Sequence, residues 1–166
     1  MVVNQCRADR IRPVPSRVRS MSSPPHLHPE NQICLSLYSA TNALMRAYRP
    51  FLEPLDLTYP QYLVMLVLWQ EDDLSVTDIC ERTRLDTGTV TPLLKRLAAK
   101  GLLARERSDE DERKRVISLT RKGAALQKEA NDIPIRMSCL GVLTPKQGER
   151  IKALAEALYG NLAALG

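Results

Sequence analysis

The sequence has 166 residues, of which 44% are hydrophobic and 26% are charged, so the chain can form one globular domain with a real core. Its formal net charge is +5. No apolar run approaches the roughly 20 residues needed to span a bilayer, and the N-terminus lacks the apolar core of a signal peptide. These features argue against a membrane protein and lead us to expect a cytoplasmic one.

The four cysteines, Cys6, Cys34, Cys80 and Cys139, lie far apart and form no CxxC pair, and both histidines lie near the N-terminus. A zinc site is therefore not expected, and no motif indicates another cofactor. In a cytoplasmic protein such cysteines should be reduced thiols, and any disulfide among them would be transient or regulatory.

The first 29 residues carry five arginines and five prolines without an apolar pattern, which predicts a disordered basic tail. The tail could contact phosphates weakly. It could equally be an inert extension, or the true start could be Met21. The folded domain is expected to occupy residues 30–166.

Apolar residues recur at three- and four-residue spacing between Asn31 and about Leu52, which predicts a long amphipathic helix. A second, semi-polar stripe runs beside them from Cys34 to Tyr48. One stripe can face the chain's own core, and the other most simply faces a second subunit, so we expect a homodimer. The apolar stripe consists of Ile33, Leu37, Ala40, Leu44, Ala47 and Phe51.

The middle of the chain contains two further helix starts. Thr58 and Gln61 form a capping-box pattern that opens a helix ending near Gln70, and this helix is apolar nearly all round, as expected for the buried centre of a domain. Ser75 opens a shorter helix in the same way. Cys80 lies on this helix among core positions and is interpreted as a small buried hydrophobic residue.

The next helix has a clear beginning and end, because Asp86 is a good N-cap and Gly101 can adopt the left-handed turn that ends helices. Its inward face is apolar, while its outer face is small near the N-terminus and cationic farther on. These properties are typical of a recognition helix that enters a DNA groove. The inward residues are Val90, Leu93, Leu94 and Leu97, and the candidate DNA-contacting residues are Thr87, Gly88, Thr91, Pro92, Lys95 and Arg96.

Two short runs, Leu102–Arg105 and Arg115–Leu119, flank a charged segment and predict a β-hairpin with a charged tip. Residues 95–122 contain ten Lys or Arg and five Asp or Glu, a surplus equal to the charge of the whole chain. A charge run alone usually marks a solvated surface. Directly after a capped, basic-faced helix, however, it favours DNA binding.

Two helices are expected after the hairpin. Thr120 caps the first, which is interrupted by Pro134 and ends at Gly141, and Thr144 caps the second. No independent core is left for them, so together with the first helix they should form a dimerisation region. Their apolar stripes are Leu126, Ala130, Ile133, Met137 and Leu140, and then Ile151, Leu154, Ala155, Leu158 and Leu162.

The segments TGTVTPLLKRL, KGLL and DERKRVISLT resemble the winged helix-turn-helix of the MarR family of bacterial regulators, and the resemblance covers roughly residues 31–166. It implies a mainly α fold with a small β-hairpin wing, in which residues 58–120 bind DNA and residues 30–54 and 121–166 form the dimerisation helices. The recognition helix would enter the major groove. In the wing, Arg113 would enter the minor groove, Asp111 would orient the tip, and Arg115 would also contact DNA.

Residues 31–69 closely resemble the organic hydroperoxide resistance regulators, a peroxide-sensing branch of that family. The resemblance implies that Cys34 is the sensor, that Tyr48 and Tyr59 hydrogen bond to it, and that Cys139 resolves the oxidised form. Cys34 and Tyr48 are 14 residues apart, hence about 21 Å along a continuous helix. If they meet, they must therefore belong to different subunits, with the first helices antiparallel.

The leading hypothesis is a homodimeric repressor, not an enzyme, which leaves double-stranded operator DNA when an organic hydroperoxide oxidises Cys34. Cys139 of the partner subunit would then form a disulfide with Cys34, although Cys139 could instead only pack, leaving Cys34 to a small thiol. One alternative is a repressor that responds to a small phenolic or carboxylate ligand. Another is a thiol peroxidase, which the absence of a recycling CxxC motif weakens.

Overall fold

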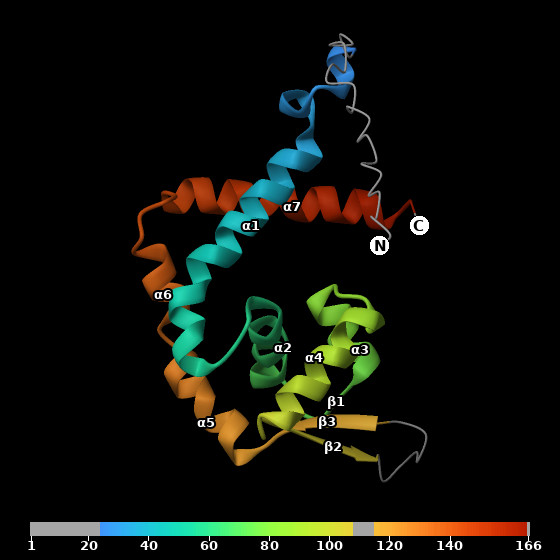
Figure 1. Cartoon of the computed structure of the whole chain (residues 1–166), viewed down its shortest axis with the longest axis vertical. Coiled ribbons are helices and arrows are strands. Elements are labelled where there is room, and N and C mark those ends of the chain that lie inside the picture. Colours follow the sequence, from blue (N-terminus) through green and yellow to red (C-terminus); the bar gives the residue numbers. More distant parts are fainter. Residues whose placement is uncertain (1–23, 108–114, 166) are drawn as a thin grey trace, which may run out of the picture. The chain divides into compact units, whose positions relative to one another are not determined.

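The computed structural model describes residues 24–107 and 115–165 (Figure 1). Contacts divide the chain into two compact units, Met1–Ala40 and Thr41–Gly166. The division falls inside helix α1 (Ile33–Leu52), which runs through both ranges.

The first unit contains two short 3-10 turns, η1 (Pro25–Leu27) and η2 (Pro29–Asn31), followed by the start of α1. These turns lie in and next to the segment expected to be a tail, and α1 begins two residues later than the predicted Asn31. The Asn31 side-chain amide donates to the Pro25 carbonyl at 2.7 Å. Over its whole length α1 buries only Leu52, which neither predicted stripe included.

The second unit is mainly helical with one small sheet, as the sequence predicts. Figure 1 shows α2, α3 and α4 gathered beside the sheet. After α1 its elements are η3 (Glu53–Leu55), α2 (Tyr59–Gln70), β1 (Leu74–Ser75), α3 (Val76–Thr83), α4 (Thr87–Ala99), β2 (Leu103–Arg107), β3 (Arg115–Leu119), α5 (Arg121–Ala130), α6 (Ile133–Ser138) and α7 (Pro145–Ala163).

Side-chain caps begin these helices where the sequence predicts them. Complete capping boxes join Thr58 to Gln61 at α2 and Ser75 to Asp78 at α3. The Thr120 side chain accepts from the backbone N–H of Gly123 at the start of α5. Each cap satisfies backbone donors that a helix end otherwise leaves without partners.

The sheet has three strands rather than the two expected. β3 is central and antiparallel to both neighbours, with Leu74 of β1 opposite Ile117 and Leu103 of β2 opposite Leu119. The third strand, β1, was not predicted, because it has only two residues. β2 begins one residue later than predicted and extends to Arg107.

The core lies in the second unit and extends from the end of α1 to the start of α6. Every buried hydrophobic residue among the described residues falls between Leu52 and Ile133. α2 is central, as predicted, although Leu66 on it is exposed. The one buried polar residue of the described ranges, Gln61, is accounted for by its capping role at α2. Cys80 packs against the core as predicted, but it is half-buried rather than buried.

The C-terminal region differs from the prediction in two ways. The helix expected from Thr120 to Gly141 with an interruption at Pro134 is divided into α5 and α6 slightly earlier, at Asn131–Asp132. Leu140, which was predicted to belong to its apolar stripe, is exposed. Gly141 adopts a positive φ of 64°, consistent with its predicted role as a terminator. In the part of the chain described, no helix is both long and apolar enough to cross a membrane.

Candidate nucleic-acid interface and thiol sites

Helix α4, the predicted recognition helix, begins where the sequence predicts. One carboxylate oxygen of Asp86 accepts the Thr89 backbone N–H at 2.8 Å, and the other accepts the Thr89 hydroxyl at 2.7 Å. These hydrogen bonds lower the pKa of Asp86, so the cap stays ionised at neutral pH. At the other end Gly101 has a φ of 70°, which favours glycine.

The two faces of α4 separate as expected. Val90, Leu93, Leu94 and Leu97 are buried, so their side chains fix the helix to the core. The opposite face is left open to solvent, which is what contact with DNA requires. Its exposed candidates are Thr87, Gly88, Pro92, Lys95 and Arg96, while Thr91 is half-buried.

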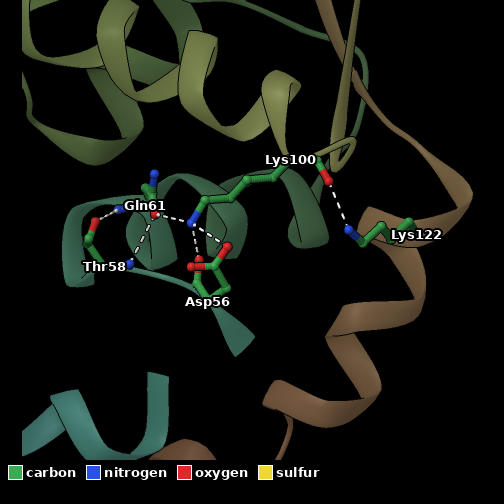
Figure 2. Close-up of polar contacts among 5 residues, drawn as sticks. All are labelled: Asp56, Thr58, Gln61, Lys100 and Lys122. Carbon is green, nitrogen blue, oxygen red and sulfur yellow. Dashed lines mark hydrogen bonds and ion pairs between the residues drawn. The ribbon is translucent and has the colours of Figure 1, made fainter. Parts of the chain in front are cut away.

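The end of α4 is tied to the start of α2 by Lys100, as Figure 2 shows. The Lys100 ammonium group contacts the Asp56 carbonyl, lies 3.1 Å from the Asp56 carboxylate and donates to Gln61 Oε1 at 3.4 Å. Lys122 donates to the Lys100 carbonyl at 2.9 Å, which links α5 to the same point. Sequence reasoning did not single out Lys100, because its partners are about 40 positions away.

The wing is described only at its base. Asp111 and Arg113 lie outside the described residues, so their predicted roles stay predictions. Arg115 begins β3 and pairs in register with Arg107 of β2, and its side chain is not described. The Leu119 N–H donates to the Asp72 carboxylate at 2.8 Å, which anchors the far end of β3 to the loop after α2.

The two tyrosines predicted to serve the sensor lie side by side. The ring centroids of Tyr48 and Tyr59 are 5.0 Å apart. A third ring, that of the buried Tyr62, contacts both at 6.0 and 6.5 Å, and it also meets Trp69 edge-on at 6.2 Å. Tyr62 was not predicted, because in the sequence it is one of many apolar positions of α2.

Burial raises the pKa of all three tyrosines. Tyr48 raises the pKa of Tyr59 further, and both raise that of Tyr62, because neighbouring phenolates would repel each other. The hydroxyl groups therefore stay protonated at physiological pH. A protonated hydroxyl is a hydrogen-bond donor, which is the form that stabilises a thiolate.

The thiols occupy different environments. Cys34 is exposed near the start of α1, in a shallow apolar depression formed with Leu27, Leu35 and other residues of the first unit. Cys139 is exposed at the C-cap of α6. Cys80 lies on α3, with its sulfur 3.7 Å from the hydroxyl of Thr87.

A family model described as "Transcriptional regulator SarA/Rot" matches residues 46–130, about half of the chain. The organic hydroperoxide resistance transcriptional regulator of Bacillus subtilis (strain 168) is 46% identical over 140 residues, covering 84% of this chain and 93% of the relative. This chain belongs to the SarA/Rot family of MarR-like winged-helix regulators. As a family member it is a DNA-binding transcriptional regulator rather than an enzyme.

Solved structures agree with this assignment. The structure of reduced AbfR bound to DNA matches this chain with a TM-score of 0.70 and 32% identity, and the match covers 82% of this chain and 93% of AbfR. AbfR comes from Staphylococcus epidermidis. AbfR with its disulfide formed matches with a TM-score of 0.57 and 31% identity, covering 78% of this chain and 91% of AbfR.

Proposed function

We propose that this protein is a homodimeric, cytoplasmic repressor that binds operator DNA when reduced and leaves it when an organic hydroperoxide oxidises Cys34. The observation that carries the proposal is the contact between Tyr48 and Tyr59, with ring centroids 5.0 Å apart. These are the two hydroxyl donors that the resemblance assigns to the sensor thiol. The similarity to a relative named for organic hydroperoxide resistance supports the same proposal.

The chemistry begins at the sulfur of Cys34. The thiolate attacks the terminal peroxide oxygen of the hydroperoxide, the O–O bond breaks, and the products are a sulfenic acid and an alcohol after protonation of the alkoxide. Tyr48 and Tyr59 of the partner subunit donate hydrogen bonds to the sulfur and so favour the thiolate over the thiol. Their raised pKa values keep both hydroxyls available as donors.

The oxidised form is then resolved by a second thiol. The sulfenic acid of Cys34 condenses with Cys139 of the other subunit, which forms a disulfide and releases water. A disulfide requires Cα atoms within about 7 Å of each other, so the helices that carry these residues must approach to that distance. Both thiols are exposed in the single chain, as this step requires.

The dimer contacts two half-sites about one helical turn apart, with one α4 in each major groove. Thr87, Gly88, Thr91 and Pro92 approach the base edges, and Lys95 and Arg96 contact phosphates. In the wing, Arg113 enters the minor groove, Asp111 orients the tip, and Arg115 adds a further contact. The exposed outer face of α4 supports this arrangement.

A cavity of about 520 Å³ supports a second candidate function, in which a small carboxylate or phenol causes release. Arg46 and Arg49 contribute cationic side chains to its lining, and Tyr59 lies on its wall. Its other charged residues are Glu53 and the paired Asp56 and Lys100. A carboxylate could pair with the two arginines without any change at Cys34. The two functions therefore differ in whether a thiol is needed.

The deciding experiment measures operator binding by fluorescence anisotropy after addition of cumene hydroperoxide or salicylate. The DNA is the region upstream of the protein's own gene. We expect the hydroperoxide to release wild-type protein and Cys80→Ser, but not Cys34→Ser, which should still bind DNA. Release of Cys34→Ser by salicylate, with no effect of hydroperoxide on wild type, would favour the second candidate.

A non-reducing gel tests the resolving step. Hydroperoxide should produce a covalent dimer in wild type, Cys6→Ser and Cys80→Ser, and no such dimer in Cys34→Ser or Cys139→Ser. A covalent dimer that persists in Cys139→Ser would rule out the proposed pairing.

A further inference from the structure

The turn between α3 and α4 contains a residue in an unusual backbone conformation. Arg84, the C-cap of α3, has φ 58° and ψ 29°, in the left-handed region that non-glycine residues seldom occupy. Arg84 stands two positions before Asp86, the N-cap of the recognition helix. A shift of the Arg84 backbone would therefore displace the start of α4, because only Leu85 separates Arg84 from the N-cap.

The side chain of Arg84 is held by α7. Its guanidinium group lies 2.7 Å from the Glu156 carboxylate and 4.1 Å from the centroid of the Tyr159 ring. Glu156 and Tyr159 are three positions apart and so lie on the same face of α7. The hydrogen bond from Arg84 lowers the pKa of Glu156, which keeps this carboxylate ionised.

These contacts are better suited to positioning than to stability. The side chains of Arg84 and Glu156 are 43% and 49% exposed, and ion pairs at such exposure contribute little to stability. Helix α7 buries no residue, so no hydrophobic core fixes it to the rest of the second unit. A guanidinium group that is both paired and stacked is, in contrast, held in direction as well as in distance.

We propose that Arg84 is a positioning residue that couples α7 to the turn of the helix-turn-helix, so that displacement of α7 reorients α4. The proposal rests on the proposed function, because Cys139 precedes α7 by a short connection and ends α6. Drawing Cys139 into a disulfide moves the start of α7. Glu156 and Tyr159 then pull on Arg84, and the recognition helix leaves the position that fits the groove.

The test uses α7 variants, because their exposed positions leave the winged-helix core intact. The double variant Glu156→Gln/Tyr159→Leu removes the ion pair and the ring, whereas Tyr159→Phe keeps the ring and is the matched control. Two quantities are measured for each protein. One is the ratio of operator affinity before and after oxidation, with disulfide formation followed on gels, and the other is amide hydrogen exchange at Thr87–Thr89 in the reduced protein without DNA.

We expect the double variant to form the disulfide as wild type does. The factor by which its operator affinity falls on oxidation should be at least about fivefold smaller than the wild-type factor, within the usual range of allosteric coupling. Exchange at the first turn of α4 should be faster than in wild type and in Tyr159→Phe. An unchanged exchange rate in the double variant overturns the coupling, whatever the response to peroxide. If wild type shows no peroxide response while exchange does accelerate, the proposed function fails and the coupling stands.

Discussion

Helices α2 and α7 begin with the same local signal and end in different environments. Each starts with a complete capping box, Thr58 with Gln61 in one and Thr144 with Gln147 in the other, and each has a proline within its first two positions. Five of the 12 residues of α2 are buried, whereas no described residue of α7 is buried. Local sequence therefore determines that both are helices, and only packing determines which one the single chain can hold in place.

The exposed face of α7 is apolar, which is costly for a helix in water. Ile151, Leu154 and Leu162 are each more than half exposed. A helix that obtains little packing from its own chain usually obtains it from a partner. The contrast with α2 thus agrees with a winged-helix part that folds within one chain and a C-terminal helix that is completed by a second copy.

The largest expected effect comes from the core beneath α4. Leu94 is fully buried, so Leu94→Ala should lower the free energy of unfolding by about 2–5 kcal/mol through lost burial and a residual cavity. Urea denaturation followed by tryptophan fluorescence measures this. A loss below about 1 kcal/mol would mean that α4 is held by something other than this core.

The next effect concerns self-association. Leu154→Lys places a charge on the apolar face of α7, and it should weaken the proposed dimer by about 2 kcal/mol or more, as expected at the centre of an interface. Sedimentation equilibrium measures the dimer dissociation constant. Lys152→Gln, two positions away, is the control and should leave the dimer intact. Equal dimer stability in Leu154→Lys and wild type would remove this face from the interface.

A smaller effect compares the two capping boxes directly. Thr58→Ala should cost about 1 kcal/mol of stability, because α2 is part of the cooperative core and loses one cap. Thr144→Ala removes the same cap from α7 and should leave the urea midpoint of the core unchanged while accelerating amide exchange in α7. If Thr144→Ala lowered that midpoint as much as Thr58→Ala, the two regions would unfold as one unit.

The smallest effect is that of pH on the contact between α7 and the turn. The pKa of Glu156 is lower in the folded state, so its ion pair contributes fully above the ordinary carboxylate pKa and is lost as the pH falls through the lowered value. An NMR titration of the Glu156 carboxyl group should show its pKa rising in Arg84→Ala. The same pKa in both proteins would mean that Arg84 does not hold this carboxylate.

The features that the sequence predicted well are local ones. Caps at Thr58, Ser75, Asp86 and Thr120 depend on residues three positions away, and the buried stripe of α4 depends on spacing within a single helix. The strand β1 depends instead on Leu74 pairing with a residue more than 40 positions later. The two residues of β1 are too few to form a recognisable strand pattern, so the sequence alone does not predict this pairing.

The candidate site divides in the same way. Tyr48 and Tyr59 could be proposed from a resemblance that includes both of them, and their ring contact agrees with it. Tyr62 lies in an apolar run that gives no sign of its aromatic partners. Arg84 looks like any polar residue at a helix end, because its partner Glu156 is 72 positions away.

Trp69 is the single tryptophan of the sequence, and its surroundings give the protein a built-in optical probe. Its indole N–H donates to the Gly123 carbonyl at 2.9 Å, and its ring meets Tyr62, which in turn contacts Tyr48 and Tyr59. A side chain at position 123 would collide with the backbone of Leu102, so only glycine fits where α5 packs this closely. The tryptophan emission of the unlabelled protein therefore comes from one place, separated by the Tyr62 ring from the tyrosines that the resemblance assigns to the sensor, and changes there can be followed in real time.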